Sequence, residues 1–300
     1  MNRFSCTTNA SNTGANNLCE NKLSVVRKLI FCPPGYSIAT EASALLHATW
    51  LTATKAVKAD RIYPFPTAVS VTIESQEDIY QDRPIAGRKF LREGKEQFTL
   101  MMDIPLTLLK KLRTFNSRAG SVFLGDEEGN IIGWTANGTT FNAFTIQELH
   151  IGKMAYTDGA IAREVPVSVV LRDPREFNDN GAIIQPTWNI YDLDGVYDVV
   201  LVASAPSGTG VTVSVTIDSI DPTDPVGQIT GLVVADFVLT DDTPTSKTIT
   251  AVTDNGDGTY HLAATMSADN YIVNLRACSA ISLTDIAIES TGSTTFTVPA

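Results

Sequence analysis

The sequence has no long hydrophobic run and no apolar segment near its N-terminus. A run of about 18 apolar residues, close to the least that spans a membrane, is absent. The first 19 residues are rich in Asn, Ser and Thr, and no apolar stretch follows Arg3, so they lack the pattern of a secretory signal. We therefore expect synthesis in the cytoplasm and no membrane insertion.

Close cysteine pairs are also missing. Cys6, Cys19 and Cys32 are spaced thirteen residues apart, and Cys278 lies far along the chain. Structural zinc sites usually take their ligands in close pairs, and no histidine precedes His47. We expect free thiols in a reducing compartment, no bound metal and no cofactor.

Catalytic motifs are absent in the same way. The three histidines, His47, His150 and His261, are isolated, and each lies in a segment with helical or strand periodicity. There is no G-x-S-x-G nucleophile elbow, phosphate-binding P-loop or H-E-x-x-H metal motif. A lone histidine in a regular element is more often structural than catalytic. We therefore expect no catalytic residue and no enzyme.

Positive charge is nearly absent from the last third of the chain. From Thr187 onward, 14 Asp and Glu face only Lys247 and Arg276, a net charge of −12; the remaining 20 Lys/Arg and 19 Asp/Glu give residues 1–186 a net charge of +1. A surface that binds nucleic acid needs clustered Lys and Arg. The net negative charge of the last third of the chain instead suits a domain displayed on a surface. The alternative is that it only keeps a β-domain soluble.

The length of 300 residues favours two domains. Residues 1–38 are expected to form a polar arm and a short strand, residues 39–186 a β-domain, and residues 187–300 a second β-domain. Helical periodicity predicts helices near residues 41–58 and 105–116. The residues expected to pack the second helix against the sheet are Leu108, Leu109, Leu112 and Phe115.

Alternating apolar residues and turn signals predict the strands of both β-domains. In the middle part these strands are residues 67–75, 97–103, 121–125, 131–135, 139–153 and 161–172. In the C-terminal part they are residues 197–203, 211–217, 229–239, 248–253, 260–266, 271–276 and 286–297. Seven short strands at this spacing indicate an immunoglobulin-like (Ig-like) sandwich. The run 254–260 resembles a calcium loop, but it leads into a strand rather than a helix, so we interpret it as a hairpin turn.

Residues 76–95 are too charged for a core and too long for an ordinary hairpin loop. We expect a long polar loop that contacts a neighbouring subunit; a solvated hairpin is the alternative. The charged residues expected to make this contact are Glu77, Asp78, Asp82, Arg83, Arg88, Lys89, Arg92 and Glu93.

The region from residue 105 to 182 has a short helix followed by strands that end in characteristic turns. The residues that carry this pattern are Asp126, Gly129, Gly133, Gly138, Phe144, Asp158, Gly159, Asp173, Pro174 and Gly181. With it the region resembles the tail-tube subunits (major tail proteins) of siphovirus-type bacteriophages of Bacteroidetes-type hosts. The segment 251–275 resembles bacterial and phage Ig-like repeats.

The resemblance implies a mainly β fold: a tail-tube-like β-sandwich or barrel with one or two flanking helices, followed by an Ig-like β-sandwich. It implies a virion structural protein, made in the bacterial host cytoplasm, whose copies form rings of six that stack into a tail tube around a DNA-conducting channel. The implied partners are further copies of the chain, the tape-measure protein and the tail terminator, and genomic DNA would pass through the lumen without sequence-specific binding. The Ig-like domain would serve weak adhesion to carbohydrate or host surfaces.

Two features leave other functions open. The cysteine-bearing arm and the helix near residues 41–58 exceed what a minimal tube subunit needs, so a phage capsid, head-decoration or connector protein is an alternative. A surface adhesin is a further alternative because of the Ig-like domain, although the chain lacks a secretory signal.

Overall fold

The computed structural model describes residues 24–83, 87–155, 164–218, 220 and 224–299. With 45% of residues in strands against 15% in helices, the protein is mainly β, which confirms the predicted fold class. The chain divides into two compact units, and the second contains residues 51–58 and 195–300. The predicted N-terminal arm, residues 1–23, lies outside the described residues.

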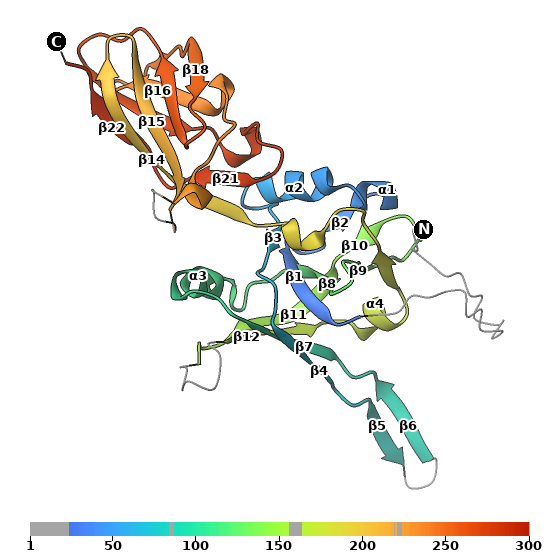
Figure 1. The fold of residues 1–300 in the computed structure, drawn as a ribbon. Coiled ribbons are helices and arrows are strands. Elements are labelled where there is room, and N and C mark those ends of the chain that lie inside the picture. Colours follow the sequence, from blue (N-terminus) through green and yellow to red (C-terminus); the bar gives the residue numbers. More distant parts are fainter. Residues whose placement is uncertain (1–23, 84–86, 156–163, 219, 221–223, 300) are drawn as a thin grey trace. The chain divides into compact units, whose positions relative to one another are not determined.

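Unit 1 is built on an antiparallel sheet of eleven strands (Figure 1). Its longest path runs in the order β2-β10-β9-β8-β11-β12-β7-β4, with β1 paired to β8, β3 to β1 and β13 to β9. The strands are β1 (Val26–Cys32), β2 (Ser37–Ile38), β3 (Tyr63–Pro64), β4 (Ser70–Ser75), β7 (Glu96–Met102), β8 (Ser121–Asp126), β9 (Ile131–Trp134), β10 (Phe141–Asn142), β11 (Phe144–Ile151), β12 (Val165–Leu171) and β13 (Gly181–Ile184). Strand β1 is therefore part of the main sheet, although the sequence places it with the polar arm.

Alternation along the strands fills the core of unit 1. On β7 and β12 every second side chain is buried, as the period of two requires when one face of a strand is covered. All six residues of β8 are buried, because β8 pairs with β1 on one side and with β9 and β11 on the other. Burial of these side chains supplies the main stabilisation of the unit.

The segment between β3 and β4 is hydrogen-bonded to β1. The Phe65 amide donates to the Leu29 carbonyl at 2.8 Å, and the Ala68 amide donates to the Arg27 carbonyl at 2.7 Å. Beyond this point β4 pairs only with β7 among the described residues. One backbone edge of β4 is therefore left available for pairing.

The prediction of one continuous helix near residues 41–58 is wrong. The helical segment is split into α1 (Glu41–Ala44) and α2 (His47–Lys55). The Ala44 carbonyl accepts from the Trp50 indole at 2.7 Å, and the Leu45 carbonyl accepts from the Trp188 indole at 2.9 Å. Because these indoles take carbonyls that a continuous helix would use, the helix ends and restarts. Leu46, between the two helices, is 59% exposed.

The second predicted helix is present. Residues 105–116 contain α3 (Leu106–Leu112) and the 3-10 turn η1 (Arg113–Phe115).

The predicted strand 139–153 is not continuous. It is divided into β10 and β11, because the intervening Ala143 amide donates to the Tyr36 carbonyl at 3.1 Å. Its neighbour β12 is followed by the short helix α4 (Pro174–Asn178), which Asp173 caps by accepting from the Arg175 amide at 3.0 Å. The predicted turn at Asp158 and Gly159 lies outside the described residues.

Unit 1 extends past the predicted boundary at residue 186, to Asp194. Ile190 and Leu193, in and after the 3-10 turn η2 (Ile190–Asp192), are buried. The Tyr191 hydroxyl donates to the Asp126 carbonyl at 2.6 Å, and the Lys28 ammonium donates to the Tyr191 carbonyl at 3.2 Å. Burial lowers the pKa of Lys28. Truncation of the chain at residue 186 would therefore remove part of the core of unit 1.

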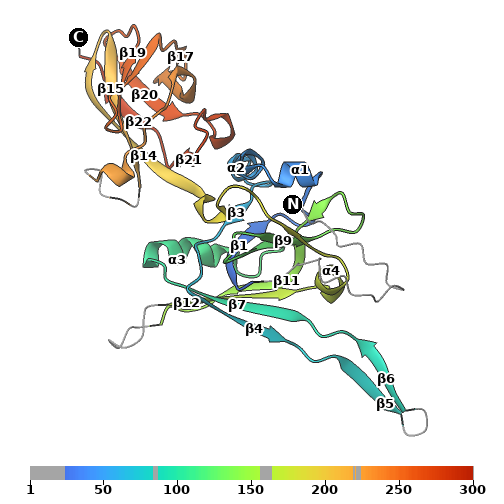
Figure 2. The same cartoon turned by 45° about the vertical axis from the view of Figure 1, so that its right-hand side comes forward.

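Unit 2 is a sandwich of two sheets (Figures 1 and 2). The five-stranded sheet has the order β18-β19-β15-β14-β21, and the four-stranded sheet has the order β17-β16-β20-β22. The strands are β14 (Val196–Ser207), β15 (Gly210–Ile217), β16 (Phe237–Asp241), β17 (Ser246–Lys247), β18 (Ala251–Asp254), β19 (Thr259–Ala263), β20 (Asn270–Leu275), β21 (Ala287–Ser290) and β22 (Thr294–Thr297), with 3-10 turns η3 (Pro225–Gly227), η4 (Val234–Asp236) and η5 (Cys278–Ala280). The two sheets bury one common core, which includes Val213, Tyr260 and Val273.

Two predictions within unit 2 have opposite outcomes. The turn between β18 and β19 is confirmed as a hairpin turn, in which the Asp257 carboxylate accepts from the Thr259 amide at 3.0 Å. The predicted strand 229–239 is wrong over most of its length. Its residues form a coil and η4 before β16 starts at Phe237, because the Asp236 carboxylate accepts from the amides of Val233 and Ser282, both at 2.8 Å, and so holds a turn.

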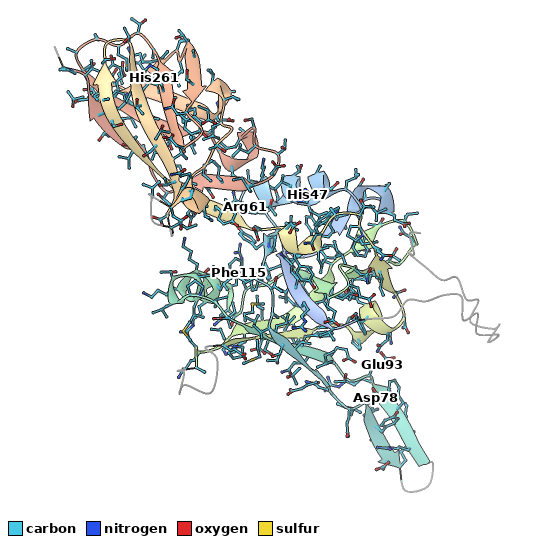
Figure 3. The ribbon with its side chains drawn as sticks, viewed as in Figure 1. His47, Arg61, Asp78, Glu93, Phe115 and His261 are labelled. Atoms are coloured by element: carbon cyan, nitrogen blue, oxygen red, sulfur yellow. The ribbon has the colours of Figure 1, made fainter. Side chains whose placement is uncertain are left out.

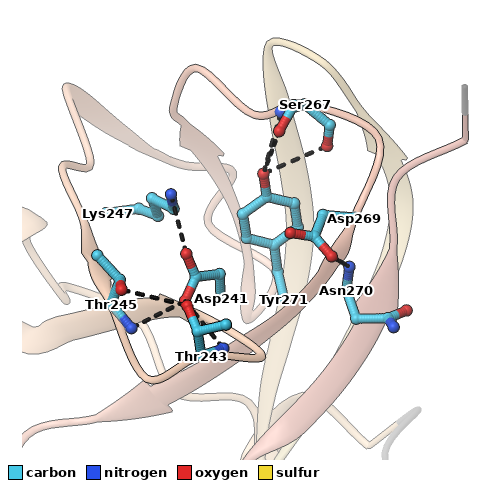
Figure 4. A network of polar contacts seen from close by, with 8 residues as sticks. All are labelled: Asp241, Thr243, Thr245, Lys247, Ser267, Asp269, Asn270 and Tyr271. Carbon is cyan, nitrogen blue, oxygen red and sulfur yellow. Dashed lines mark hydrogen bonds and ion pairs between the residues drawn. The ribbon is translucent and has the colours of Figure 1, made fainter.

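A second carboxylate network joins β16 to β17 (Figure 4). The Asp241 carboxylate accepts from the Thr243 hydroxyl and the Thr245 amide, both at 2.8 Å, and its other oxygen lies 3.0 Å from the Lys247 ammonium. The hydrogen bond from Thr243, followed by that from Lys247, holds the pKa of Asp241 well below its usual range. This network connects the two strands through side chains as well as through the backbone.

The Asp241 network predicts an acid-sensitive unit 2. A carboxyl group whose pKa is lower in the folded than in the unfolded chain stabilises the fold above its unfolded pKa of about 3.9 and loses that contribution as the pH falls toward the folded pKa. We expect Asp241→Asn to lower the Tm of unit 2 near neutral pH. Below about pH 4, the Tm of the variant should decrease less steeply with falling pH than that of the wild-type chain. Circular dichroism melting across this range measures both effects. Asp242→Asn, at the exposed neighbour, is the control, and an unchanged acid slope in Asp241→Asn would contradict the assignment.

Candidate functional site

The candidate functional site is an exposed surface of unit 1 that we call the hairpin surface: strand β4 together with β5 (Ile79–Arg83) and β6 (Gly87–Arg92). Strands β5 and β6 pair only with each other, as a two-stranded sheet. In both views they continue the line of β4 and β7 beyond the rest of unit 1 (Figures 1 and 2). Residues 76–95 are thus a β-hairpin and not the predicted loop.

Hydrogen bonds at the base fix where the hairpin leaves the main sheet. The Gln76 amide donates to the Lys95 carbonyl at 2.9 Å, and the Gly94 amide donates to the Asp78 carboxylate at 2.9 Å. Asp78 and Glu93 both lie at this base (Figure 3). Among the described residues, one buried carboxylate oxygen of Glu93 has no hydrogen-bond partner. A buried acceptor without a donor is costly, so the base is the part of the hairpin where a contact from another molecule would add most.

One face of the hairpin carries an aromatic pair beside an ion pair. Tyr80 lies opposite Phe90, with ring centroids 5.6 Å apart and the rings inclined at 68°. The Arg88 guanidinium lies 4.2 Å from the centre of the Tyr80 ring and 3.6 Å from the Asp82 carboxylate. All of these side chains are exposed. The face therefore combines apolar area with balanced charge, a composition suited to contact with protein.

Large apolar side chains are uncovered along the whole hairpin surface. Their exposed fractions are 52% for Val69 just before β4, 54% for Ile73, 39% for Ile79, 40% for Tyr80, 47% for Phe90 and 52% for Leu91. Ile73 lies opposite the buried Phe98 of β7, so it belongs to the core-facing side of β4. The core of unit 1 is thus open at its β4 edge. Exposed large apolar side chains gathered along one element favour contact with another protein.

The charged residues predicted for this segment have different surroundings. Among the described residues, Asp82 and Arg88 are the one ion pair within this set, and Asp78 accepts a hydrogen bond at the base. The remaining exposed members are Glu77, Arg83, Lys89 and Arg92. Sequence reasoning from charge missed the apolar members of the surface, although the adjacent pairs Ile79-Tyr80 and Phe90-Leu91 have residue types that are enriched in strands.

The residues predicted to pack the second helix lie on the other side of unit 1's core. Leu109 and Leu112 are buried, and Leu108 and Phe115 are half-buried against the same cluster. The Phe115 ring contacts three others, with centroid distances of 4.9 Å to Tyr63, 5.3 Å to Phe31 and 5.6 Å to Phe65. Helix α3 and η1 therefore close one end of the core with side chains that are not part of the hairpin surface.

Groups with catalytic or metal-binding chemistry do not converge in the described part of the chain. His47 lies 4.9 Å from the Trp188 ring, whereas His150 and His261 are on strands of different units. Cys32 and Cys278 are buried and are not in a disulfide, and Cys6 and Cys19 lie outside the described residues. Within the part of the chain that the structure describes, no cluster of three His, Cys, Asp or Glu is placed to hold a metal ion, and no helix has the length and apolar character to cross a membrane.

Comparison with protein-family models and with curated proteins finds no match for the chain. A functional assignment therefore rests on the hairpin surface and on the resemblance of the sequence to tail-tube subunits.

Proposed function

We propose that the protein is a self-assembling structural subunit of a phage tail tube. The single observation that carries this proposal is the β5–β6 hairpin, whose aromatic and aliphatic side chains are exposed on a two-stranded sheet with no core of its own. An isolated two-stranded hairpin is marginally stable in water. Packing against another chain would cover its apolar side chains and stabilise it.

The second component of the proposal is the open edge of β4. A β-strand edge with unpaired backbone groups and uncovered apolar side chains favours pairing with another chain. Copies that pair at this edge would form a ring, since a repeated contact between different surfaces closes when its rotation allows. In the proposed tube, rings of six copies stack around the channel, and the hairpin contacts the adjacent ring.

The C-terminal unit has a separate place in this proposal. Residues 51–58 and 195–300 hold 12 Asp and Glu against four Lys and Arg, a net charge of −8, so this unit would repel other copies of itself and the DNA phosphates. An outer, solvent-facing position suits such a domain better than the lumen. We propose that it is an Ig-like appendage on the outside of the tube, with weak affinity for carbohydrate on a host surface.

Electron microscopy of the purified full-length chain tests the assembly proposal. We expect rings or tubes of uniform width in negative stain, and a weight-average mass that rises with concentration in sedimentation. Closed shells would instead support the alternative of a capsid protein. A chain that stays monomeric at high concentration would rule out self-assembly.

Charge reversal on the hairpin tests its part in stacking. We expect the triple variant Arg88→Glu, Lys89→Glu and Arg92→Glu to shorten the tubes, because it leaves Asp82 without its cationic partner and gives the hairpin a strongly negative charge. The shortening should depend on salt, since exposed charges are screened over about 10 Å at 0.1 M salt. Tube lengths in micrographs at two salt concentrations measure the effect. Unchanged lengths at both would exclude a role of these charges in stacking.

A further inference from the structure

Both cations of the acidic C-terminal segment line the same pocket. The pocket has a volume of about 310 Å³ and lies over β16, between β17 and the end of β20. Its lining contains Lys247 and Arg276, the only Lys or Arg from Thr187 onward. The two cations of a segment with 14 acidic residues thus lie at one pocket, where Lys247 is paired with Asp241.

The two cations differ in whether their charge is paired with a carboxylate. Lys247 is held 3.0 Å from the Asp241 carboxylate, which also accepts from Thr243 and Thr245 (Figure 4). The Arg276 side chain is exposed, and within the described part of the chain its guanidinium has no ion pair or side-chain hydrogen bond. A guanidinium presents paired N–H donors that match the two oxygens of a carboxylate. Arg276 is therefore the group to which an anion would bind.

Apart from Ser246, the other residues of the lining are apolar, although polar atoms make up most of its exposed surface. Val234, Ala235, Val238 and Ile249 contribute to the walls, and Ser246 adds a hydroxyl. A volume of about 310 Å³ is at the small end of ligand pockets and suits one sugar ring rather than a chain of several. The C–H face of a pyranose can pack on aliphatic side chains while its hydroxyl groups stay in water or reach polar groups.

We propose that this pocket binds a single carboxylate-bearing sugar residue, with the carboxylate on Arg276 and the ring against the valines. The proposal rests on the outer, carbohydrate-binding role proposed for the C-terminal unit, and it names the class of sugar. It is independent of ring or tube formation, because none of the pocket residues belongs to unit 1. The surrounding acidic charge keeps the affinity low, so that adhesion would depend on many copies binding together.

Saturation-transfer NMR on the full-length chain tests the proposal, since the method works for monomers and large assemblies alike. The probes are D-glucuronate, the neutral D-glucose and acetate. We expect saturation transfer to glucuronate with millimolar affinity, none to glucose, and weaker binding of acetate. Arg276→Gln should weaken glucuronate binding about tenfold or more, as loss of a charge-assisted hydrogen bond does. Lys110→Gln, which removes an exposed cation of α3, is the matched control and should leave binding unchanged.

Each other outcome overturns part or all of the proposal. No transfer to glucuronate, or equal transfer in Arg276→Gln, excludes the pocket as the site. Equal binding of glucose excludes a role for the carboxylate, and acetate bound as tightly as glucuronate reduces the site to a simple anion site. Micrographs of the same samples report assembly separately, so a failure of sugar binding is distinguished from a failure of the tube proposal.

Discussion

The double variant Tyr80→Ser with Phe90→Ser is expected to leave the chain folded and unable to assemble. The two rings contact each other on an exposed face and are outside the core of unit 1, so their removal costs the monomer little. In the proposed interface they would be buried. Full burial of a large apolar side chain contributes about 1.5–3 kcal/mol, and Tyr80 and Phe90 are 40% and 47% exposed, so covering the rest of the pair would contribute about 1.3–2.6 kcal/mol for each contact. This corresponds to a loss of about 10- to 80-fold in association at each contact.

Sedimentation velocity over a concentration series measures this loss, and circular dichroism melting shows whether the variant is folded. The matched control is Val202→Ser with Val226→Ser, which removes two exposed apolar side chains from unit 2. The control should assemble as the wild-type chain does. Wild-type assembly by the Tyr80 and Phe90 variant would show that the hairpin is not the contact surface.

Gly94→Ala is expected to have the second-largest effect, at the base of the hairpin. A Cβ atom at Gly94 would overlap the backbone carbonyl of Gln76, and a backbone group cannot move aside as the end of a side chain can. The hydrogen bond from the Gln76 amide to the Lys95 carbonyl would be lost with it. We expect the hairpin to separate at its base and assembly to fall by at least about tenfold, since substitutions that force backbone movement are among the most damaging.

Hydrogen exchange separates this local effect from general unfolding. Amides of β5 and β6 should exchange much faster in Gly94→Ala, whereas those of β8 and β12 in the core should keep their protection. Gly292→Ala is the control, because a Cβ atom at Gly292 would meet no other atom within 4 Å. Protection of β5 and β6 equal to that of the wild-type chain would contradict the structural role given to Gly94.

The sequence predicts the strands of this protein well where alternation coincides with burial. Strands β7, β15 and β20 match their predicted ranges to within one residue at each end, because each has one covered face. The prediction failed where side chains, rather than periodicity, decide the structure. Residues 229–239 have strand composition, yet the Asp236 carboxylate holds a turn through contacts with a residue 46 positions away.

The charged residues of 76–95 drew attention to the segment that contains the candidate site, but their abundance led to the prediction of a loop where the structure has strands β5 and β6. The exposure of Tyr80 and Phe90 could not be predicted, because aromatic residues in a strand are usually read as core. Likewise, nothing in the sequence brings Lys247 and Arg276 together, since pairing of β16 with both β17 and β20 places them on one pocket.

A projecting hairpin without its own core has a kinetic consequence for polymer growth. The conformational entropy of ordering β5 and β6 must be offset by the first contact between two subunits, which makes that contact unfavourable. Later subunits would add to hairpins that are already ordered at a growing end. Nucleation would then be slow relative to elongation, so assembly of the purified chain would begin after a lag that added preformed ends shorten.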